Sequence, residues 1–277
     1  MDILLARLHQ LRPVAEYQQR IPIHRQVVFL IVGVSCVLLL SALLLTQLYG
    51  YHGLFAELNG WGARLPGQIW AAITLLGDTR VALAFLLIFV YRNPQILPAT
   101  LFAAVPVTLV IHFFKNFYQL ERPAAVLNVD SFNLIGKALK AGSFPSGHSA
   151  TIGVIAALLI LISRYGFQRV VVIVLMLVVA VSRVMVGAHW PVDTFVGSAI
   201  GLLFGLMGYW LSTRYQLLRG RVSQWLLVAL LLVAAYTTFF NNGGYPSGHY
   251  FAMAIALVAL ISYHFHLLSQ LRQPSSQ

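Results

Sequence analysis

Three short polar segments in an otherwise apolar chain combine residue types that handle phosphate. In chain order they are Lys115 with Arg122-Pro123, then Pro145-Ser146-Gly147-His148, then Ser182-Arg183 with His189 and Asp193. Lysine and arginine donate hydrogen bonds to oxyanions, histidine transfers protons or attacks as a nucleophile, and a carboxylate orients a histidine. The three segments together predict a site that binds a phosphate group and transfers it.

The phosphate-binding part of this site is predicted to combine side-chain cations with backbone amides. Lys115, Arg122 and Arg183 have donors and no acceptor, and an arginine can hold an oxyanion through two parallel hydrogen bonds. Ser146-Gly147 directly precedes an apolar helix, whose first N–H groups and dipole favour a bound anion. Glycine at the second of these positions lets the backbone approach the anion closely.

The reactive part is predicted to be a histidine oriented by an aspartate. His189 and Asp193 are four residues apart, and Pro191 suits the first turn of a new helix. Asp193 can therefore accept a hydrogen bond from Nδ1 of His189, which leaves Nε2 free to attack phosphorus. His148 comes from another helix and can protonate the leaving oxygen as general acid.

The rest of the chain has the composition of an integral membrane protein. Of its 277 residues, 59% are hydrophobic and only 9% are charged, whereas soluble domains carry about 25% charged residues. The mean hydropathy of +0.81 agrees. A net charge of +11 in a soluble chain would suggest nucleic-acid binding, but here we expect it to set the orientation in the membrane.

Apolar runs predict an all-α, polytopic fold of about eight spans. The predicted spans are Val27–Leu48, Thr79–Val90, Ile96–Phe117, His148–Ile162, Val170–Val186, Pro191–Leu211, Trp225–Phe240 and Phe251–Leu267. The second is the least regular, because Asp78 and Arg80 would be costly at mid-membrane. We therefore expect an interfacial or re-entrant stretch over Leu54–Leu76, a turn at 77–80, and a local Asp78–Arg80 ion pair.

Alternating the sides of these spans sorts the charges. The side that holds both termini has a net charge of +9, and the side that holds the three polar segments has +2. The positive-inside rule then predicts cytoplasmic termini and a site at the outer, periplasmic face of a bacterial-type inner membrane. The expected division is a basic N-terminal segment at 1–26, a six-helix core at 27–215, and an accessory C-terminal hairpin with a short tail at 216–277.

The three polar segments resemble the signature motifs of the type 2 phosphatidic acid phosphatase superfamily, and all three are complete and in the family's order. The resemblance spans Lys115 to Asp193 and implies a metal-independent lipid phosphatase with a six-helix membrane core and a phosphohistidine intermediate. By matched position it implies His189 as nucleophile, Asp193 as its partner and His148 as general acid. It also implies phosphate binding by the remaining motif residues, Lys115, Arg122, Ser146, Gly147 and Arg183.

The expected substrate is a lipid phosphomonoester or diphosphate in the bilayer, with undecaprenyl diphosphate, phosphatidylglycerophosphate, phosphatidate and lipid A phosphate as candidates. We expect no cofactor, and no bound divalent metal because the acidic residues are few and scattered. We expect no nucleic-acid partner, because most of the excess positive charge sets the orientation in the membrane. The sequence does not indicate an oligomeric state. A lipid-to-lipid phosphotransferase would use the same residues. A transporter or lipid-binding scaffold fits less well, because its polar groups would lie near the membrane midplane.

Two further features lie outside this assignment. Pro246-Ser247-Gly248-His249 repeats the second motif without companions of the other two, so we interpret it as a structural turn, the alternative being a secondary headgroup contact. His112 lies one turn before Lys115, where a histidine packed within its helix is the expectation and a side chain that supports the site residues is the alternative.

Overall fold

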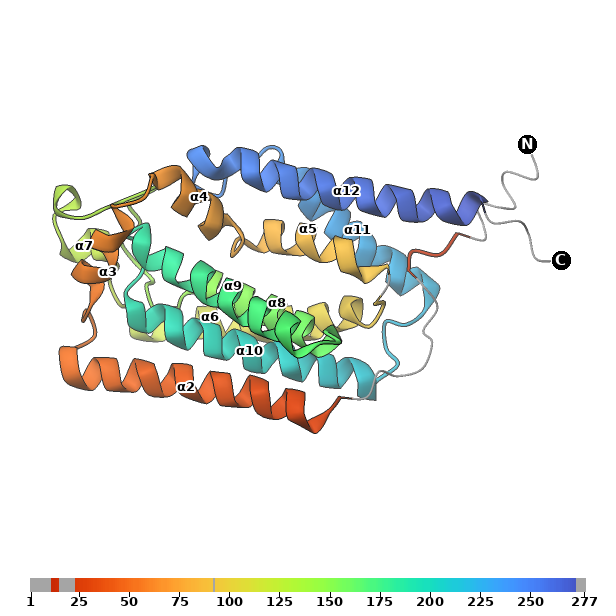
Figure 1. Ribbon diagram of the computed structural model, residues 1–277, viewed down its shortest axis with the longest axis horizontal. Coiled ribbons are helices and arrows are strands. Elements are labelled where there is room, and N and C mark those ends of the chain that lie inside the picture. The colour runs from red at the N-terminus through yellow and green to blue at the C-terminus, as the bar shows by residue number, and fades with distance from the viewer. Residues whose placement is uncertain (1–10, 15–22, 92, 273–277) are drawn as a thin grey trace.

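The computed structural model describes residues 11–14, 23–91 and 93–272, and no strand occurs among them. The helices are α2 (Arg25–Tyr49), α3 (Phe55–Gly62), α4 (Gly67–Leu75), α5 (Thr79–Val90), α6 (Ile96–Tyr118), α7 (Pro123–Val126), η1 (Val129–Ser131), α8 (Gly147–Ile162), α9 (Gly166–Met185), α10 (Pro191–Arg214), α11 (Arg221–Thr238), η2 (Pro246–Gly248) and α12 (His249–Arg272). The long helices run along one axis, and α3, α4 and α7 gather at one end (Figure 1).

The all-α, membrane-spanning class is confirmed. Within the described ranges, six helical stretches are long and apolar enough to cross a membrane: α2, α6 with α7, α9, α10, α11, and η2 with α12. Helices α4 and α5 meet this criterion only together, across a bend of 63°, and the apolar α8 is shorter, with 16 residues. A count of eight spans therefore stays a prediction, although every predicted span is largely helical.

The bend between α4 and α5 is built by the residues in which the sequence predicted a turn. Asp78 caps α5 by accepting a hydrogen bond from the N–H of Arg80 at 2.9 Å. The Arg80 guanidinium returns to the same carboxylate, with Nη2 2.9 Å from Oδ2. The expected local ion pair is therefore present, and it places the positive charge of Arg80 against the negative charge of Asp78 at the start of α5.

Helix α10 lies at the centre of the packing that positions the site, because small residues let its neighbours approach. Gly197, Gly201 and Gly205 follow one another at four-residue intervals and face α8. A Cβ at Gly201 would lie 2.1 Å from the carbonyl oxygen of Ala150, and one at Gly197 would lie 2.4 Å from that of Ser146. Close backbone contact of this kind is typical of packed membrane helices. It fixes the start of α8 against the start of α10.

The C-terminal hairpin packs chiefly on α5. Helices α11 and α12 both contact α5, and α12 also contacts α4. Ala84, Ala235 and Ala256, one from each of the three helices, form a fully buried cluster. The sequence analysis counted α5 with the core and the hairpin as an accessory, whereas by its contacts α5 joins the hairpin to the rest of the bundle.

The outward faces of the long helices are apolar. Phe29 on α2 is 73% exposed, Phe167 on α9 is 67% exposed and Val222 on α11 is 74% exposed. Large apolar side chains at such exposure are unfavourable in water and favourable in hydrocarbon. The surface therefore suits a bilayer.

Candidate active site

The eight predicted site residues lie at the end of the bundle that carries α3 and α7 (Figure 1). At this end α6 and α9 finish and α8 and α10 begin, so segments far apart in the sequence meet. The close α8–α10 contact holds two of the three motifs in register. A direct backbone hydrogen bond, from the N–H of Ser146 to the carbonyl oxygen of Asp193 at 3.0 Å, joins them.

His189 and Asp193 form the predicted pair. The Nδ1 atom of His189 is 3.2 Å from Oδ2 of Asp193, and the two side chains are 1% and 0% exposed. Asp193 also accepts from the N–H of Trp190 at 3.0 Å, as the first turn of α10 requires. The carboxylate therefore caps its own helix and orients the imidazole at the same time.

Two hydroxyl groups that the sequence analysis did not identify complete the shell of Asp193. Tyr51, in the loop after α2, donates a hydrogen bond to Oδ1. Ser143, just before the second motif, donates to Oδ2 at 2.5 Å. Donors on both oxygens stabilise the buried carboxylate in its charged form. Neither residue belongs to a spaced motif, so no pattern in one sequence marks it.

Arg122 contacts the nitrogen of His189 that faces away from Asp193. Its Nη1 lies 3.1 Å from Nε2 of His189 and also donates to the carbonyl oxygen of Ala188 at 3.1 Å. Since a guanidinium has no acceptor, Nε2 must accept and the imidazole proton must be on Nδ1. His189 is thus a neutral imidazole whose Nε2 lone pair faces a cation.

Backbone carbonyls hold the other donors of the site. Arg122 donates from Nε to Ala141 at 2.9 Å and from Nη2 to Gly142 at 3.2 Å, and Lys115 donates from Nζ to Gly142 at 2.9 Å. Within the described residues, none of the three site cations, Lys115, Arg122 and Arg183, makes a salt bridge to a carboxylate. Their charge therefore remains available to an anion.

Two buried nitrogen atoms in the predicted set have no hydrogen-bond partner among the described residues. They are Nε of Arg183 and Nε2 of His148. Arg183 is 2% exposed, and burial of an unpaired donor is unfavourable unless a ligand or water satisfies it. Arg183 is otherwise held by Thr74 and Tyr245, whose hydroxyl groups accept from Nη1 at 2.6 and 2.8 Å. No motif or spacing in the sequence predicts these two contacts.

Ser146 and Gly147 differ in what they can offer a phosphate. Ser146 is fully buried and caps α8, because its Oγ accepts from the N–H of Ser149 at 3.3 Å and also from Oγ of Ser149 at 2.9 Å. Gly147 is the first residue of α8, and a Cβ there would approach only Ile111, at 4.0 Å. Gly147 is therefore not crowded by side chains of other segments, and it lines a cleft together with His148. For Ser146 the phosphate contact stays a prediction.

The pKa of His189 is lowered well below its ordinary value of 6.5, first by burial and then by the positive charges of Arg122 and Arg183. A neutral imidazole is the form that can attack phosphorus. The cations predicted to bind phosphate thus also keep the predicted nucleophile, His189, unprotonated.

Two clefts meet at this end of α6. The larger, of about 550 Å³, is polar and is lined by Lys115, Arg122 and Lys140 together with Asn116 and Gln119. The smaller, of about 200 Å³, runs past Gly147 and His148 toward Thr79.

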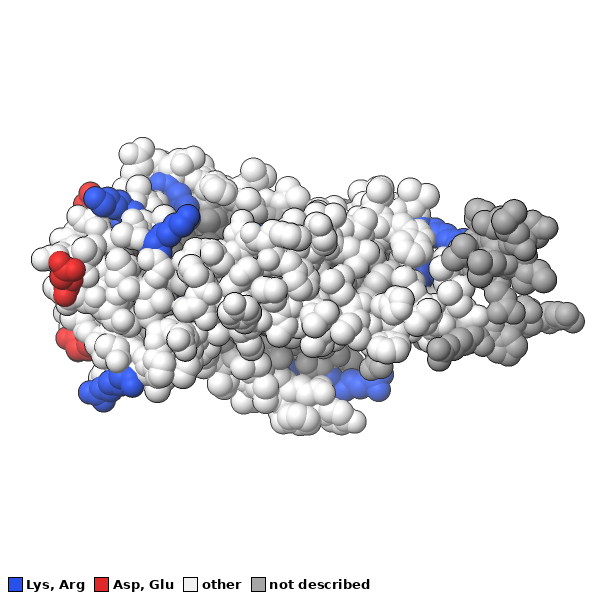
Figure 2. Space-filling model, turned by 90° about the horizontal axis from the view of Figure 1, so that it is seen from above, with Lys and Arg blue, Asp and Glu red and all other residues white. Residues whose placement is uncertain are grey.

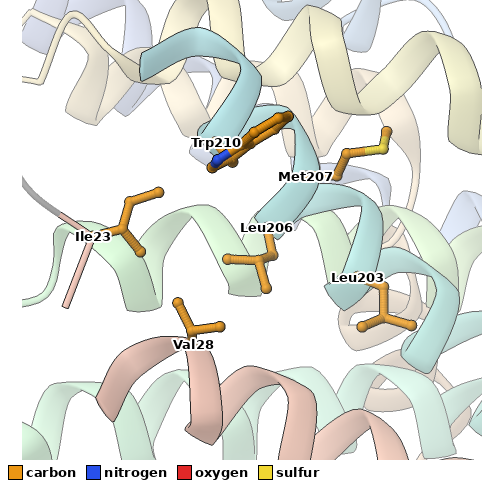
Figure 3. A pocket seen from close by; sticks show the side chains of 6 residues that line it. All are labelled: Ile23, Val28, Leu203, Leu206, Met207 and Trp210. Atoms are coloured by element: carbon orange, nitrogen blue, oxygen red, sulfur yellow. The ribbon is translucent and has the colours of Figure 1, made fainter. Parts of the chain in front are cut away.

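His112 lines both of these clefts and is exposed, so the expectation that it packs within its helix is wrong. A third, apolar cavity of about 440 Å³ lies near the opposite end of the bundle, where Val28 faces Leu206 and Trp210 (Figure 3).

The comparisons with known proteins agree with the motifs. The PAP2 superfamily model matches residues 95–217. A protein named lipid A 1-phosphatase in Rhizobium johnstonii is 47% identical over 66 residues, which cover 24% of this chain and 26% of that protein. A protein of the same name in Porphyromonas gingivalis is 38% identical over 74 residues, which cover 26% of this chain and 17% of that protein. The chain thus spans about a quarter or less of the length of these relatives.

A solved structure is similar over more of the chain. The crystal structure of LpxE from Aquifex aeolicus is 28% identical, with a TM-score of 0.48, and the match covers 58% of this chain and 93% of that one. The segment matched by the family model contains every predicted site residue from Lys115 to Asp193. Residues 95–217 match the model of the PAP2 superfamily, and the three motifs within them resemble those of the type 2 phosphatidic acid phosphatases.

Proposed function

We propose that this protein is a membrane lipid phosphatase that hydrolyses a lipid phosphomonoester or diphosphate through a phosphohistidine at His189. The observation that carries the proposal is the position of that imidazole, bound to Asp193 through Nδ1 and facing Arg122 through Nε2. This is the arrangement of an oriented, neutral nucleophile beside a phosphate-binding cation.

In the first step the Nε2 lone pair of His189 attacks phosphorus and the bond to the lipid oxygen breaks. The monoanionic lipid phosphate supplies a proton to His148, His148 passes a proton on to the leaving oxygen, and the lipid alcohol leaves. Asp193 stabilises the charge that develops on the imidazole. Lys115, Arg122 and Arg183 stabilise the phosphoryl oxygens, and they can do so because no carboxylate neutralises them within the described residues.

In the second step water attacks the phosphohistidine. His148, now unprotonated, takes a proton from the water, the N–P bond breaks, and inorganic phosphate leaves. The sum is lipid phosphate plus water giving lipid alcohol plus phosphate. The partnerless Nε2 of His148 is the atom to which we assign both proton transfers.

Lipid A 1-phosphate is the substrate we favour among the candidates. Two observations support it: the relatives that carry the name lipid A 1-phosphatase, and the polar cleft of about 550 Å³ beside Lys115 and Arg122. Amide and cationic side chains such as Asn116, Gln119 and Lys140 suit a headgroup rich in hydroxyl groups. The smaller cleft between α5, α6 and α8 offers the phosphate a lateral way in from the bilayer.

We expect the site to face the periplasm of a bacterial-type inner membrane. The connections at the opposite end of the bundle carry arginines and no described acidic residue: Arg164, Arg169, Arg214, Arg219 and Arg221. In Figure 2 the Asp and Glu side chains appear only at the α3/α7 end, whereas Lys and Arg appear at both ends. This asymmetry supports the orientation under the positive-inside rule.

The test is phosphate release in detergent from lipid A 1-phosphate, phosphatidate and undecaprenyl diphosphate, with and without EDTA. Wild type should release phosphate in EDTA, and His189→Ala should not. Equal release by both proteins would overturn the mechanism, and loss caused only by EDTA would overturn its metal independence. With labelled phosphate, appearance of the label only in a second lipid would replace hydrolysis by the phosphotransferase reaction.

A further inference from the structure

We propose that Tyr245 and Thr74 are positioning residues that set the Arg183 guanidinium for phosphate, so that the C-terminal hairpin completes the active site. The inference rests on the proposed function in that Arg183 is taken to bind the phosphate. It assigns a role to two residues outside the segment matched by the family model, residues 95–217.

The contacts converge on one nitrogen of Arg183. Its Nη1 donates to Oγ1 of Thr74 at 2.6 Å and to the hydroxyl oxygen of Tyr245 at 2.8 Å, and the guanidinium carbon lies 5.5 Å from the centre of the Tyr245 ring. Thr74 is fully buried and Tyr245 is 6% exposed. Two hydroxyl acceptors and a ring face therefore hold one corner of the guanidinium.

The rest of the guanidinium is left for a ligand. Nε of Arg183 is inaccessible to solvent and has no hydrogen-bond partner within the described residues. An arginine binds an oxyanion through two donors in a fixed plane, so the orientation of that plane decides whether both hydrogen bonds form. Holding Nη1 fixes the plane, since a planar group pinned at one corner and stacked on a ring has little rotational freedom.

The second Pro-Ser-Gly-His run places Tyr245 in this position. Gly248 packs against α4, where a Cβ would lie 2.5 Å from the backbone carbon of Ala71. Nε2 of His249 lies 2.7 Å from the carbonyl oxygen of Thr238, the last residue of α11, which ties the two hairpin helices together. Ser247 is exposed. These contacts support the structural interpretation of the repeat: it seats the start of α12 beside α4 (Figure 1) and brings Tyr245 to Arg183.

The experiment compares four single variants in the lipid phosphatase assay. Tyr245→Phe keeps the ring and removes the hydroxyl acceptor. Thr74→Val keeps the branched shape of the side chain and likewise removes its hydroxyl acceptor. We expect kcat/KM to fall about tenfold in each, because each loses a hydrogen bond to a charged group. Thr74→Ser should stay within about twofold of wild type. Tyr263→Phe is the matched control: it removes a buried α12 hydroxyl that bonds to Pro13, far from Arg183, and should also stay within about twofold.

A double-mutant comparison separates positioning from a general loss of stability. In an Arg183→Ala background, Tyr245→Phe should reduce activity no further, because the hydroxyl acts only through the guanidinium. Additive losses, or a Tyr245→Phe enzyme as active as Tyr263→Phe, would overturn the inference.

Binding of inorganic phosphate, measured by calorimetry, gives a second readout that does not need turnover. Wild type and Tyr263→Phe should bind alike, and Tyr245→Phe should bind about tenfold more weakly. If wild type shows no His189-dependent phosphate release, the proposed function fails, whereas the phosphate affinities still decide the role of Tyr245. Equal affinities in all three proteins would overturn that role.

Discussion

The Nη1 atom of Arg122 lies 3.1 Å from Nε2 of His189, and this contact decides where the imidazole carries its proton. Arg122 can only donate, so Nε2 is unprotonated and the proton is on Nδ1, 3.2 Å from the carboxylate of Asp193. A phosphate that binds Arg122 would take over its donor and leave the Nε2 lone pair facing phosphorus. Under the proposed function, the same arginine both keeps the His189 imidazole neutral and binds the phosphate that this imidazole attacks.

The first prediction concerns the protonation of His189. Because burial and the cations lower its pKa, the ring should be neutral at pH 6.5. As the pH falls from 6.5 to the lowered pKa, this histidine binds a proton in the unfolded chain and not in the folded protein, so the contribution of His189 to the free energy of unfolding decreases. Nitrogen NMR of histidine-labelled protein in detergent, assigned with His189→Asn, measures this pKa. Titration at or above pH 6.5 would contradict the account.

Substitution of Arg122 tests whether this cation lowers the pKa of His189. Arg122→Gln removes a positive charge next to Nε2 and should raise the pKa of His189. Arg64→Gln changes an exposed arginine at the same end of the bundle and should leave that pKa unchanged. An equal response of His189 to both substitutions would show that the contact with Arg122 is not the cause.

The second prediction concerns Tyr51, which donates to the Asp193 oxygen that does not face His189. Tyr51→Phe should lower kcat/KM about tenfold, because the carboxylate loses a charge-assisted hydrogen bond and orients the imidazole less firmly. Tyr49→Phe is a control two residues earlier, with a ring 62% exposed, and should behave as wild type. Full activity of Tyr51→Phe would remove Tyr51 from the positioning of Asp193.

The third prediction concerns the packing of α8 on α10. Gly201→Ala would place a Cβ 2.1 Å from a backbone oxygen, so the helices must separate, at a cost of about 1–3 kcal/mol in the free energy of unfolding. Activity should fall as well, because the separation also shifts Ser146 away from Asp193. Gly33→Ala on α2 meets nothing within 4 Å and should leave stability unchanged or raise it by up to about 1 kcal/mol. Thermal unfolding in detergent measures both, and equal midpoints would contradict the packing argument.

The fourth prediction concerns the polar cleft as a headgroup site. Lys140 lines it and Lys137 does not, although both are exposed lysines of one loop. Lys140→Ala should lower kcat/KM for lipid A 1-phosphate about threefold to tenfold and leave phosphatidate unaffected, since only the larger headgroup reaches the lysine. Lys137→Ala should change neither. An equal loss for both lipids would argue against a headgroup cleft.

The core of the site could be predicted from the sequence because its chemistry is local. His189 and Asp193 are one helical turn apart, and Ser146-Gly147 starts a helix, so spacing alone predicts their geometry. The predicted Asp78–Arg80 pair is likewise a contact between near neighbours, and the structure confirms it.

The supporting contacts could not be predicted because they join distant segments. Tyr51 meets Asp193 across 142 positions, and Arg183 meets Thr74 across 109. Tyr51 and Thr74 each contribute a single hydroxyl group that belongs to no spaced motif, and the role of that group depends on how the helices pack. The packing of α5 on the C-terminal hairpin is also a tertiary feature, which apolar periodicity does not specify.

The most direct test of the central claim is to trap the phosphoryl group on the protein. Wild type is mixed with lipid A 1-phosphate labelled with ³²P and quenched in alkali, in which a phosphohistidine is stable, before mass spectrometry of the labelled peptide. The account predicts a label on His189 that is lost in acid, its absence in His189→Ala, and its presence in a control with the exposed His264 replaced, His264→Ala. Label on His189→Ala, or phosphate release by wild type without any labelled protein, would contradict the account.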